Sequence, residues 1–394
     1  MSKINVFSEI EPLEVVLLHR PGKEVESLTP DLLERLLFDD IPFLKVAQAE
    51  HDAFAKHLTD NGVKVLYIEK LVAETLDQNP NLREKFVDQF ISEANIESKW
   101  AARYKEFLMR MDNQTMVNEM IGGTKKIDLD PKDKSDYPFI ADPLPNILFQ
   151  RDPFASVGEG IILNRMWSVT RNRETLFPNF VFHNHKDFAG DLFFWYDRDE
   201  THPIEGGDVL VLNDNTLIIG ISQRTELEAV KKMAERLFAN SNYQKILAID
   251  LPKTRSFMHL DTVFTNIDYD KFIVHPLIFD NIDAFKLHEI TREGIKDINK
   301  GLIDVLGELT GKKVTLIKCG GEDPIAAGRE QWNDGTNVLT IAPGKVIAYD
   351  RNWVTIDLLK KAGVEVLLMP SSELSRGRGG PRCMSMPLVR KHKK

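Results

Sequence analysis

The stretch AEHDAFAKHLTDNGVKVLYIEKL, residues 49–71, contains the building unit that decides the fold of this chain. Its first part carries apolar residues at helical spacing and ends at Asn61-Gly62. Glycine is the usual residue just past the end of a helix. The second part, Val63 to Ile68, is an apolar run rich in β-branched residues, which favours a strand. We therefore predict a helix that turns at a glycine into a strand.

The same order of elements recurs along the chain. In TIDLLKKAGVEVLLMPSSEL, residues 355–374, Gly363 separates a predicted helix from a predicted strand, and looser copies occupy 224–252 and 298–321. Short predicted strands joined by turn residues precede the helices, and a weaker fifth copy follows residue 152 and runs to 197. Such strand–strand–helix–strand units bury their faces only by packing on one another. A doubly wound α/β sheet would also alternate helices and strands, so the pattern leaves both architectures open.

One block departs from this pattern. Residues 72–137 carry apolar residues at helical spacing and few strand signals. We predict an inserted helical subdomain over 72–137, with a role in packing or subunit contact and no chemistry of its own.

The composition indicates a globular protein without nucleic-acid or membrane chemistry. Among 394 residues, 42% are hydrophobic and 28% charged, and the net charge is −9. An acidic chain lacks the basic surface that nucleic acids need, and we expect the basic tail, residues 390–394, to be a solvated end. There is no apolar signal-peptide region and no stretch long enough to span a bilayer. Two cysteines do not form a disulfide framework, so we expect a cytoplasmic location.

The segment MHLD places an imidazole beside a carboxylate. His259 and Asp261 are two residues apart on a predicted strand, so both side chains should leave the same face. The apolar flanks predict burial, and buried polar groups need partners. Taken alone, the pair fits a histidine satisfied by its neighbouring carboxylate better than a catalytic pair.

Other acidic residues also have ordinary explanations when each is taken alone. Glu205 and Asp208 bracket a double glycine, which is typical of a turn. Asp152 precedes Pro153, which keeps it extended, and it could pair with Arg151. However, each of these segments lies at the leading edge of a different repeat, so packing of the repeats would bring them to one centre. Clustered carboxylates repel one another, and a cationic ligand between them would resolve the conflict.

Cys383 lies in SRGRGGPRCMSMPL, residues 375–388, among three arginines and several glycines. Such neighbours lower the pKa of a thiol, whereas the clustered carboxylates would raise it, so we expect the thiolate to be stabilised chiefly once a substrate has bound. The glycines let the backbone approach a ligand closely. A guanidinium is a planar cation that meets carboxylates in bidentate pairs. The thiolate of Cys383 could attack the carbon of a guanidinium held by the acids, and the arginines could bind a carboxylate at the other end of the ligand.

Motifs for competing chemistries are absent from the sequence. There is no H-E-x-x-H or C-x-x-C, and His183 and His185 are too few to suggest a metal site. Neither a phosphate-binding glycine loop nor a G-x-S-x-G elbow is present. We expect no metal and no cofactor.

From EVVLLHRPG to CMSMPL, nearly the whole chain resembles the arginine deiminases, guanidino-hydrolases of the pentein superfamily. The resemblance implies an α/β fold: a five-bladed, pseudo-symmetric α/β propeller of ββαβ repeats with a helical insertion in the first repeat. It also implies one catalytic domain over residues 1–394. We further expect a homo-oligomer, a dimer or higher.

The resemblance assigns a role to each residue of the site. It implies Cys383 as nucleophile and His259 as general acid and base. The acids that hold the guanidinium fall on Asp152, Glu205 and Asp261. The contacts to the amino-acid end of the substrate fall on Asn146, Arg171, Arg224 and Arg378, with Asp208 assisting near the acids. Gln150 and Gln223 stand where the family pattern has Thr and Glu, and the role of Arg382 is left open.

The implied reaction is hydrolysis of free L-arginine to L-citrulline and ammonia through a covalent S-alkylthiouronium on the cysteine. Two other readings stay open. An amidinotransferase or a dimethylarginine hydrolase would share the same Cys, His and acid layout. A non-catalytic arginine-binding protein on the same fold would not need the intact Cys383 and His259.

Overall fold

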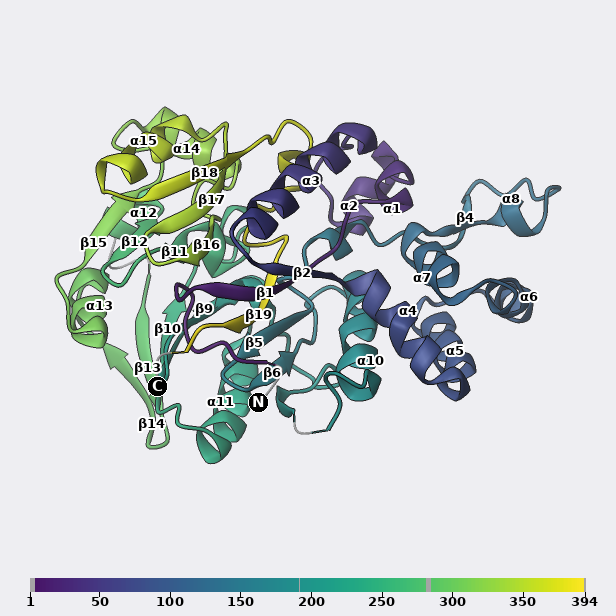
Figure 1. Ribbon diagram of the computed structural model, residues 1–394, viewed down its shortest axis with the longest axis horizontal. Coiled ribbons are helices and arrows are strands. Elements are labelled where there is room, and N and C mark those ends of the chain that lie inside the picture. Colours follow the sequence, from purple (N-terminus) through teal and green to yellow (C-terminus); the bar gives the residue numbers. More distant parts are fainter. Residues whose placement is uncertain (1–3, 191, 281–284, 393–394) are drawn as a thin grey trace.

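The computed structural model describes residues 4–190, 192–280 and 285–392, and it has an α/β fold in which helices flank mixed β-sheets (Figure 1). The last two residues of the basic tail and residue 191 of the predicted segment 191–197 lie outside the described residues. Among the described helices, none combines the length and the hydropathy that crossing a bilayer requires.

Five of the sheets formed by the described residues repeat one strand arrangement. In each, a first strand pairs antiparallel with a second, and the second pairs parallel with a third. In chain order the strands are β1 Leu13–Leu18 and β2 Lys64–Tyr67 with β19 Met386–Arg390; β5 Phe154–Val157, β6 Gly160–Leu163 and β7 Phe193–Tyr196; β8 Val209–Asn213, β9 Thr216–Ile221 and β10 Lys245–Asp250; β11 Phe264–Asn266, β12 Lys271–Val274 and β15 Thr315–Lys318; and β16 Leu339–Ala342, β17 Lys345–Tyr349 and β18 Glu365–Met369.

A helix joins the second and third strand of each of these sheets, as a parallel connection requires. These helices are α3 Leu44–Asp60, α10 Leu176–Asn184, α11 Leu227–Asn240, α13 Leu302–Thr310 and α15 Trp353–Lys361. The stretch 49–71 folds as its sequence predicts, because α3 ends before Gly62, whose φ is +78°, and β2 follows at once.

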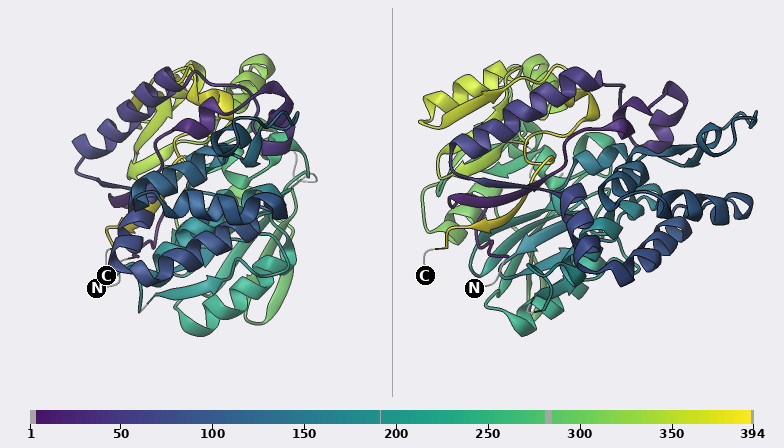
Figure 2. Two further views of the ribbon diagram at one scale, coloured as in Figure 1. Left: turned by 90° about the vertical axis from the view of Figure 1, so that its right-hand side faces the viewer. Right: turned by 45° about the vertical axis from the view of Figure 1, so that its right-hand side comes forward.

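The first sheet joins the two ends of the chain. Its first strand is β19, which pairs antiparallel with β1, so the strand just before the first helix has its partner at the end of the sequence. The N–H of Asn5 donates to the carbonyl of Leu388, and the N–H of Arg390 donates to the carbonyl of Asn5. The two termini therefore lie close together (Figures 1 and 2).

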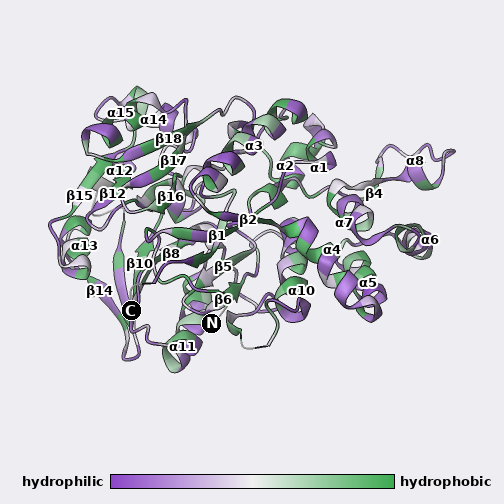
Figure 3. Ribbon diagram, in the orientation of Figure 1, coloured by the Kyte–Doolittle hydropathy of each residue, from purple (hydrophilic) through white to green (hydrophobic). Residues whose placement is uncertain are grey.

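The core lies mainly on and between these sheets. Ile219, Ile273 and Ile347, each from the second strand of a different sheet, are fully buried. Figure 3 shows apolar strands at the centre and helices whose polar faces point outward, which is the pattern of helices that cover a sheet.

A helical segment extends to one side of the sheets (Figure 2). It contains α4 Ile68–Gln78, α5 Arg83–Glu93, α6 Ser98–Met109, α7 Asn113–Gly122, α8 Lys126–Leu129 and the two-stranded sheet of β3 Thr124–Lys125 and β4 Phe139–Ala141. Phe90, Tyr104 and Leu108 are buried there, so the helices bury their apolar faces on one another. The helical content matches the prediction, although α4 already begins at Ile68; the assignment of 72–137 as a subdomain stays a prediction.

Two elements were not predicted. A hairpin of β13 Leu287–Thr291 and β14 Gly294–Ile298 lies between β12 and β15 in sequence, yet β13 pairs with β10 and extends the neighbouring sheet. Helix α14 Pro324–Trp332 follows β15. The remaining helices are short: α1 Lys23–Glu26, α2 Leu33–Leu36, α9 Val169–Asn172, α12 Pro276–Asp280, and the 3₁₀ turns η1 Pro30–Leu32, η2 Pro80–Leu82, η3 Pro145–Leu148, η4 Arg173–Thr175, η5 Gly206–Asp208, η6 Arg255–Phe257, η7 Leu260–Thr262 and η8 Leu374–Gly377.

Candidate active site

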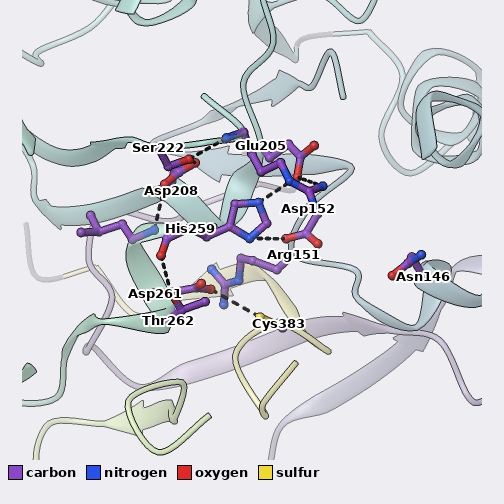
Figure 4. A network of polar contacts seen from close by, with 12 residues as sticks. Asn146, Arg151, Asp152, Glu205, Asp208, Ser222, His259, Asp261, Thr262 and Cys383 are labelled. Carbon is purple, nitrogen blue, oxygen red and sulfur yellow. Dashed lines mark hydrogen bonds and ion pairs between the residues drawn. The ribbon is translucent and has the colours of Figure 1, made fainter. Parts of the chain in front are cut away.

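Four segments that precede the first strand of four different sheets meet at one place (Figure 4). Asp152 comes just before β5, Glu205 before β8, His259 before β11 and Cys383 before β19. These residues are far apart in sequence, and all four are buried. The sequence-based expectation that the leading edges of the repeats share one centre is therefore met for these segments.

Short polar contacts connect the cluster. His259 Nε2 lies 2.7 Å from Glu205 Oε2, and His259 Nδ1 lies 3.8 Å from Asp152 Oδ1. The thiol of Cys383 lies 3.6 Å from Asp261 Oδ2. In Figure 4 the imidazole lies among the carboxylates, with the sulfur on the Asp261 side. The cluster thus holds a potential nucleophile, a potential acid or base and three carboxylates.

The local structure around the histidine differs from the prediction. His259 and Asp261 are not on a strand: His259 caps the 3₁₀ turn η7, and β11 begins only at Phe264. The apolar and aromatic residues that suggested a strand flank the pair on both sides, but only those from Phe264 onward form one. The turn sends the two side chains to different neighbours, the imidazole to Glu205 and the carboxylate toward Cys383.

The double glycine before Asp208 has a specific packing reason. A Cβ atom on Gly207 would lie 2.7 Å from Cγ of His259, and one on Gly206 would lie 2.0 Å from the carbonyl oxygen of Arg151. The sequence indicated only a turn here. The structure shows that these glycines let the η5 backbone lie directly against the imidazole.

Two carboxylate oxygens of the cluster are free to accept hydrogen bonds. Asp152 Oδ1 and Asp261 Oδ1 are buried and have no hydrogen-bond partner. Buried acceptors in proteins are nearly always paired, so two unpaired oxygens in one cluster mark a place for a ligand with N–H or O–H donors. The second oxygens of the same residues are held by Arg171 and Arg382.

The electrostatics favour a charged imidazole. Burial alone would lower the pKa of His259, but the carboxylates of Asp152 and Glu205 raise it to about 9. Burial would raise the pKa of Glu205, but Arg224 and His259 lower it to about 2. At neutral pH the two side chains therefore form an imidazolium–carboxylate pair.

The pKa of the Cys383 thiol is raised, as expected of the clustered acids, and not lowered as its arginine neighbours alone suggested. Its arginine neighbours in sequence suggested a lowered pKa, but burial and the carboxylates of Asp261 and Asp152 raise the pKa of Cys383 well above its ordinary value. Arg382 acts to lower it, but its effect is smaller than those of burial and the acids. Arg376 pairs with Asp40 and Glu373 instead.

Two of the predicted substrate-binding residues, Arg171 and Asn146, are linked to the Asp152 carboxylate of this cluster. Arg171 donates to Asp152 at 2.9 Å and to Glu174 at 2.9 Å, and its Nη2 reaches the carbonyl of Asn146 at 3.4 Å. Asn146 lies apart from the imidazole and the thiol in Figure 4. The amide of Asn146 donates to the carbonyl of Leu36.

Two of the predicted arginines stack on tryptophans. The Arg224 guanidinium lies 4.8 Å from the ring centroid of Trp167, and the Arg378 guanidinium lies 3.7 Å from that of Trp332. Nε and Nη1 of Arg224, and all three guanidinium nitrogens of Arg378, are buried without a hydrogen-bond partner. These donors can serve an anionic group, and the partly exposed rings hold the guanidinium planes in place.

Asp208 is engaged within the protein. Its oxygens accept hydrogen bonds from the hydroxyls of Ser222 and Thr225 and from the N–H of Leu260. Burial raises its pKa to about 6. The bond to Leu260, next to His259, connects Asp208 to the turn that carries the imidazole.

Sequence reasoning missed several residues of the site. Asn337 accepts a hydrogen bond from the N–H of Cys383 and donates to the carbonyl of Asp261. Trp167, Trp332 and Glu174 contact the arginines named above. The segment WNDGTN, residues 332–337, with its turn residues before a strand, was a signal of the kind used for the other four segments.

The cluster also has the geometry to hold a metal ion. Ligand atoms of Asp152, Glu205 and His259 all lie within 4.8 Å of one another. In the described structure these side chains are instead paired with the imidazolium and with Arg171. The same arrangement suits a guanidinium, so geometry alone does not separate the two kinds of cation.

Solved structures of similar proteins show the fold of this chain. SxtG, an amidinotransferase from Microseira wollei, matches with a TM-score of 0.58 at 16% identity, covering 99% of this chain and 98% of that chain. The N-terminal domain of ArgZ, an arginine dihydrolase from Cyanobacteria, matches with a TM-score of 0.55 at 14% identity, covering 95% of this chain and 97% of that chain. The protein therefore shares the α/β fold of these two enzymes.

Comparison of the sequence with known proteins identifies the family. The family model described as arginine deiminase matches residues 34–390. The arginine deiminase of Mycoplasma capricolum is 65% identical over 393 residues, which cover 98% of this chain and 97% of that protein. The arginine deiminase of Clostridium perfringens is 49% identical over 410 residues, covering 98% of each. The chain belongs to the arginine deiminase family.

Proposed function

We propose that this protein hydrolyses free L-arginine to L-citrulline and ammonia through a covalent S-alkylthiouronium on Cys383. The observation that carries the proposal is the convergence of Cys383 and His259 with two carboxylates that each keep one free oxygen. Membership of the arginine deiminase family supports the same reaction.

The substrate guanidinium would bind between Asp152 and Asp261. The free Oδ1 atoms of these residues accept its N–H groups, and two carboxylates balance its charge. Arg224 and Arg378 offer buried donors to the substrate carboxylate, with Arg171 and Asn146 nearby as further contacts. Asp208 has no free oxygen in this arrangement, so we assign it to positioning the His259 turn rather than to touching the substrate.

Attack begins when Cys383 loses its thiol proton to solvent and its sulfur forms a bond to the guanidinium carbon, which gives a tetrahedral adduct. His259 donates its proton to the departing nitrogen, the C–N bond breaks, and ammonia leaves. Water then adds to the thiouronium carbon while His259 accepts a proton. The C–S bond breaks, the hydroxyl proton of the adduct passes to solvent, citrulline forms, and the thiolate is restored. Acid–base help of this kind contributes roughly 10²–10⁴-fold to a rate.

The electrostatics explain when the nucleophile ionises. In the free protein the thiol is neutral because burial and the acids raise its pKa. A bound guanidinium offsets the charges of Asp152 and Asp261, and this favours the thiolate. Glu205 keeps His259 protonated and ready to act as the acid. The nucleophile is therefore activated mainly when substrate is present.

We further propose the architecture that the resemblance implies. Five sheets with one strand order among the described residues, and a first sheet shared by both chain ends, support a five-bladed propeller. We propose one catalytic domain over 1–394 with 72–137 as an inserted helical subdomain. A homo-oligomer also stays a prediction, and the need for a reduced Cys383 supports a cytoplasmic location.

The test is a citrulline and ammonia assay on the purified protein with free L-arginine, in the presence of EDTA. The proposal expects equal amounts of both products without an added amine, and no formation by Cys383→Ala. A product that requires an acceptor amine would indicate an amidinotransferase, and faster release of methylamines from methylated arginine would indicate a dimethylarginine hydrolase. Loss of activity with EDTA, restored by a metal, would favour a metal at Asp152, Glu205 and His259.

A further inference from the structure

A buried ion pair lies next to the candidate nucleophile, Cys383. Arg382, which precedes Cys383, is 1% exposed, and its Nη1 donates to Asp261 Oδ2 at 2.8 Å. Its Nε and Nη2 donate to the two carboxylate oxygens of Glu9 at 3.3 and 3.2 Å. One guanidinium therefore bridges a carboxylate of the site and a carboxylate from the N-terminal segment.

The bridge acts on the oxygen that faces the sulfur. Asp261 Oδ2 contacts both Arg382 and the thiol of Cys383, whereas Oδ1 is free. Holding Oδ2 fixes the rotation of the carboxylate and so fixes where Oδ1 points. The positive charge of Arg382 also acts to lower the pKa of the Cys383 thiol.

Glu9 is buried, and hydrogen bonds to Val211 hold it beside Arg382. It is 6% exposed, its N–H donates to the carbonyl of Val211, and its Oε1 accepts from the N–H of Val211. Burial would raise its pKa, but Arg382 and Arg151 lower it to about 2, so Glu9 is ionised at neutral pH. It is the counterion that allows a buried guanidinium to stay beside the site.

A second arginine ties the same counterion to the cysteine backbone. Arg151 lies 3.9 Å from Glu9, its N–H donates to the carbonyl of Cys383, and its Nε donates to the carbonyl of Arg382. Through Arg151 and Arg382, Glu9 is therefore linked both to the main chain of Cys383 and to the Asp261 carboxylate.

We propose that Glu9 and Arg382 are positioning residues of this site: Glu9 holds the Arg382 guanidinium, which fixes the Asp261 carboxylate and places a positive charge beside the sulfur. Neither side chain needs to touch the substrate. The inference rests on the proposed function, because it assumes that Cys383 and Asp261 act on a guanidinium.

The test separates charge from structure by the rate at which iodoacetamide alkylates Cys383 in the full-length protein without substrate, measured against pH. Arg382→Met keeps the bulk of the side chain and removes the positive charge, so the alkylation profile should shift to higher pH. Glu9→Gln keeps the shape but removes the counterion that holds the Arg382 guanidinium, so the profile should also shift to higher pH, by less than in Arg382→Met. Loss of packing alone would expose the thiol and shift the profile to lower pH, because burial raises its pKa.

Steady-state kinetics provide the second readout. We expect Arg382→Met to lower kcat/KM for arginine at least tenfold, because Asp261 loses its orientation, and Arg382→Lys to recover part of this loss. Arg376→Met is the matched control, since Arg376 lies in the same segment, is exposed, and pairs only with Asp40 and Glu373. It should leave both the alkylation profile and kcat/KM unchanged.

Two outcomes would overturn the proposal. If wild-type protein forms citrulline but Glu9→Gln and Arg382→Lys keep its alkylation profile and its kcat/KM, the pair has no positioning role. A shift of either profile to lower pH would also contradict it. If wild-type protein forms no citrulline, the proposed function fails instead, and the alkylation profiles still report whether the pair acts on the sulfur. Should Arg382→Met fail to fold, Arg382→Lys and Glu9→Gln carry the test.

Discussion

The imidazole of His259 has to be protonated when ammonia leaves, and its neighbours decide the pH range in which it is. Asp152 and Glu205 overcome the effect of burial and raise its pKa from 6.5 to about 9. A raised pKa means that the proton is held more strongly in the folded state. The same interaction supports both catalysis and stability.

We therefore predict an alkaline limit near pH 9 for kcat/KM. The stabilising effect of the His259 pair is fully present below pH 6.5 and is lost as the pH rises through about 9. Wild-type protein should show both the rate decline and a fall in Tm over this range, whereas Glu205→Gln should lower the alkaline limit. Rates that stay constant to pH 10 in the wild type would contradict this role for His259.

Trp332 should matter for binding rather than for chemistry. Its ring supports the Arg378 guanidinium at 3.7 Å, and cation–π contacts contribute about 0.5–2 kcal/mol. Trp332→Ala is expected to raise KM about two- to thirtyfold with a smaller change in kcat. Trp353→Ala removes another exposed tryptophan, on α15, and serves as the control with KM unchanged. Equal KM values for the two variants would remove Trp332 from the site.

At the scale of elements, the η5 turn is the part of the site least tolerant of added bulk. A methyl group at Gly207 would press on the His259 ring, where the nearest atoms lie 2.7 Å from the Cβ position. Gly207→Ala should reduce kcat by at least tenfold, because His259 loses its place beside Glu205. Gly328→Ala, in α14 with open space around it, should keep full activity and gain about 0.5–1 kcal/mol of stability. A fully active Gly207→Ala variant would show that the close approach is not required.

Elements with local signals could be predicted from the sequence. The helix–glycine–strand stretches at 49–71 and 355–374 fold as expected because the glycine, the apolar spacing and the β-branched run lie within one window. The turn at His259 was assigned wrongly because its neighbours favour a strand, while Asp208 and Gly207 from another segment hold the 3₁₀ turn. The pairing of β13 with β10 likewise depends on a distant partner.

The candidate residues could be found, but not their partners. Cys383, His259 and the acids stood out as reactive types at the leading edges of repeats. Glu9 and Arg382 are 373 residues apart, and Trp332 and Arg378 meet only through folding. No spacing rule connects such pairs, so these contacts could not be predicted from the sequence.

At the scale of the whole molecule, the last strand of the chain pairs with the first. Cys383 lies just before β19, and β19 pairs with β1, so the position of the nucleophile depends on a contact between the two chain ends. The proposed catalytic centre is therefore assembled only when the first and last segments have come together.

Truncation after Ser385 should abolish activity even though it keeps Cys383. Without β19, one edge of β1 loses its partner and the cysteine segment loses its anchor. Truncation after Arg390 keeps β19 and is the control, for which we expect wild-type activity and Tm. An active protein that ends at Ser385 would show that this sheet does not position the nucleophile.

The central claim is that sulfur at Cys383 bonds to the guanidinium carbon of arginine. It is tested most directly by mixing the protein with arginine, quenching the mixture in acid during turnover, and mapping the added mass on its peptides by mass spectrometry. We predict a fraction of protein that carries arginine minus ammonia on Cys383, and none in Cys383→Ala. Citrulline formation without any adduct, or an adduct on another residue, would contradict the account.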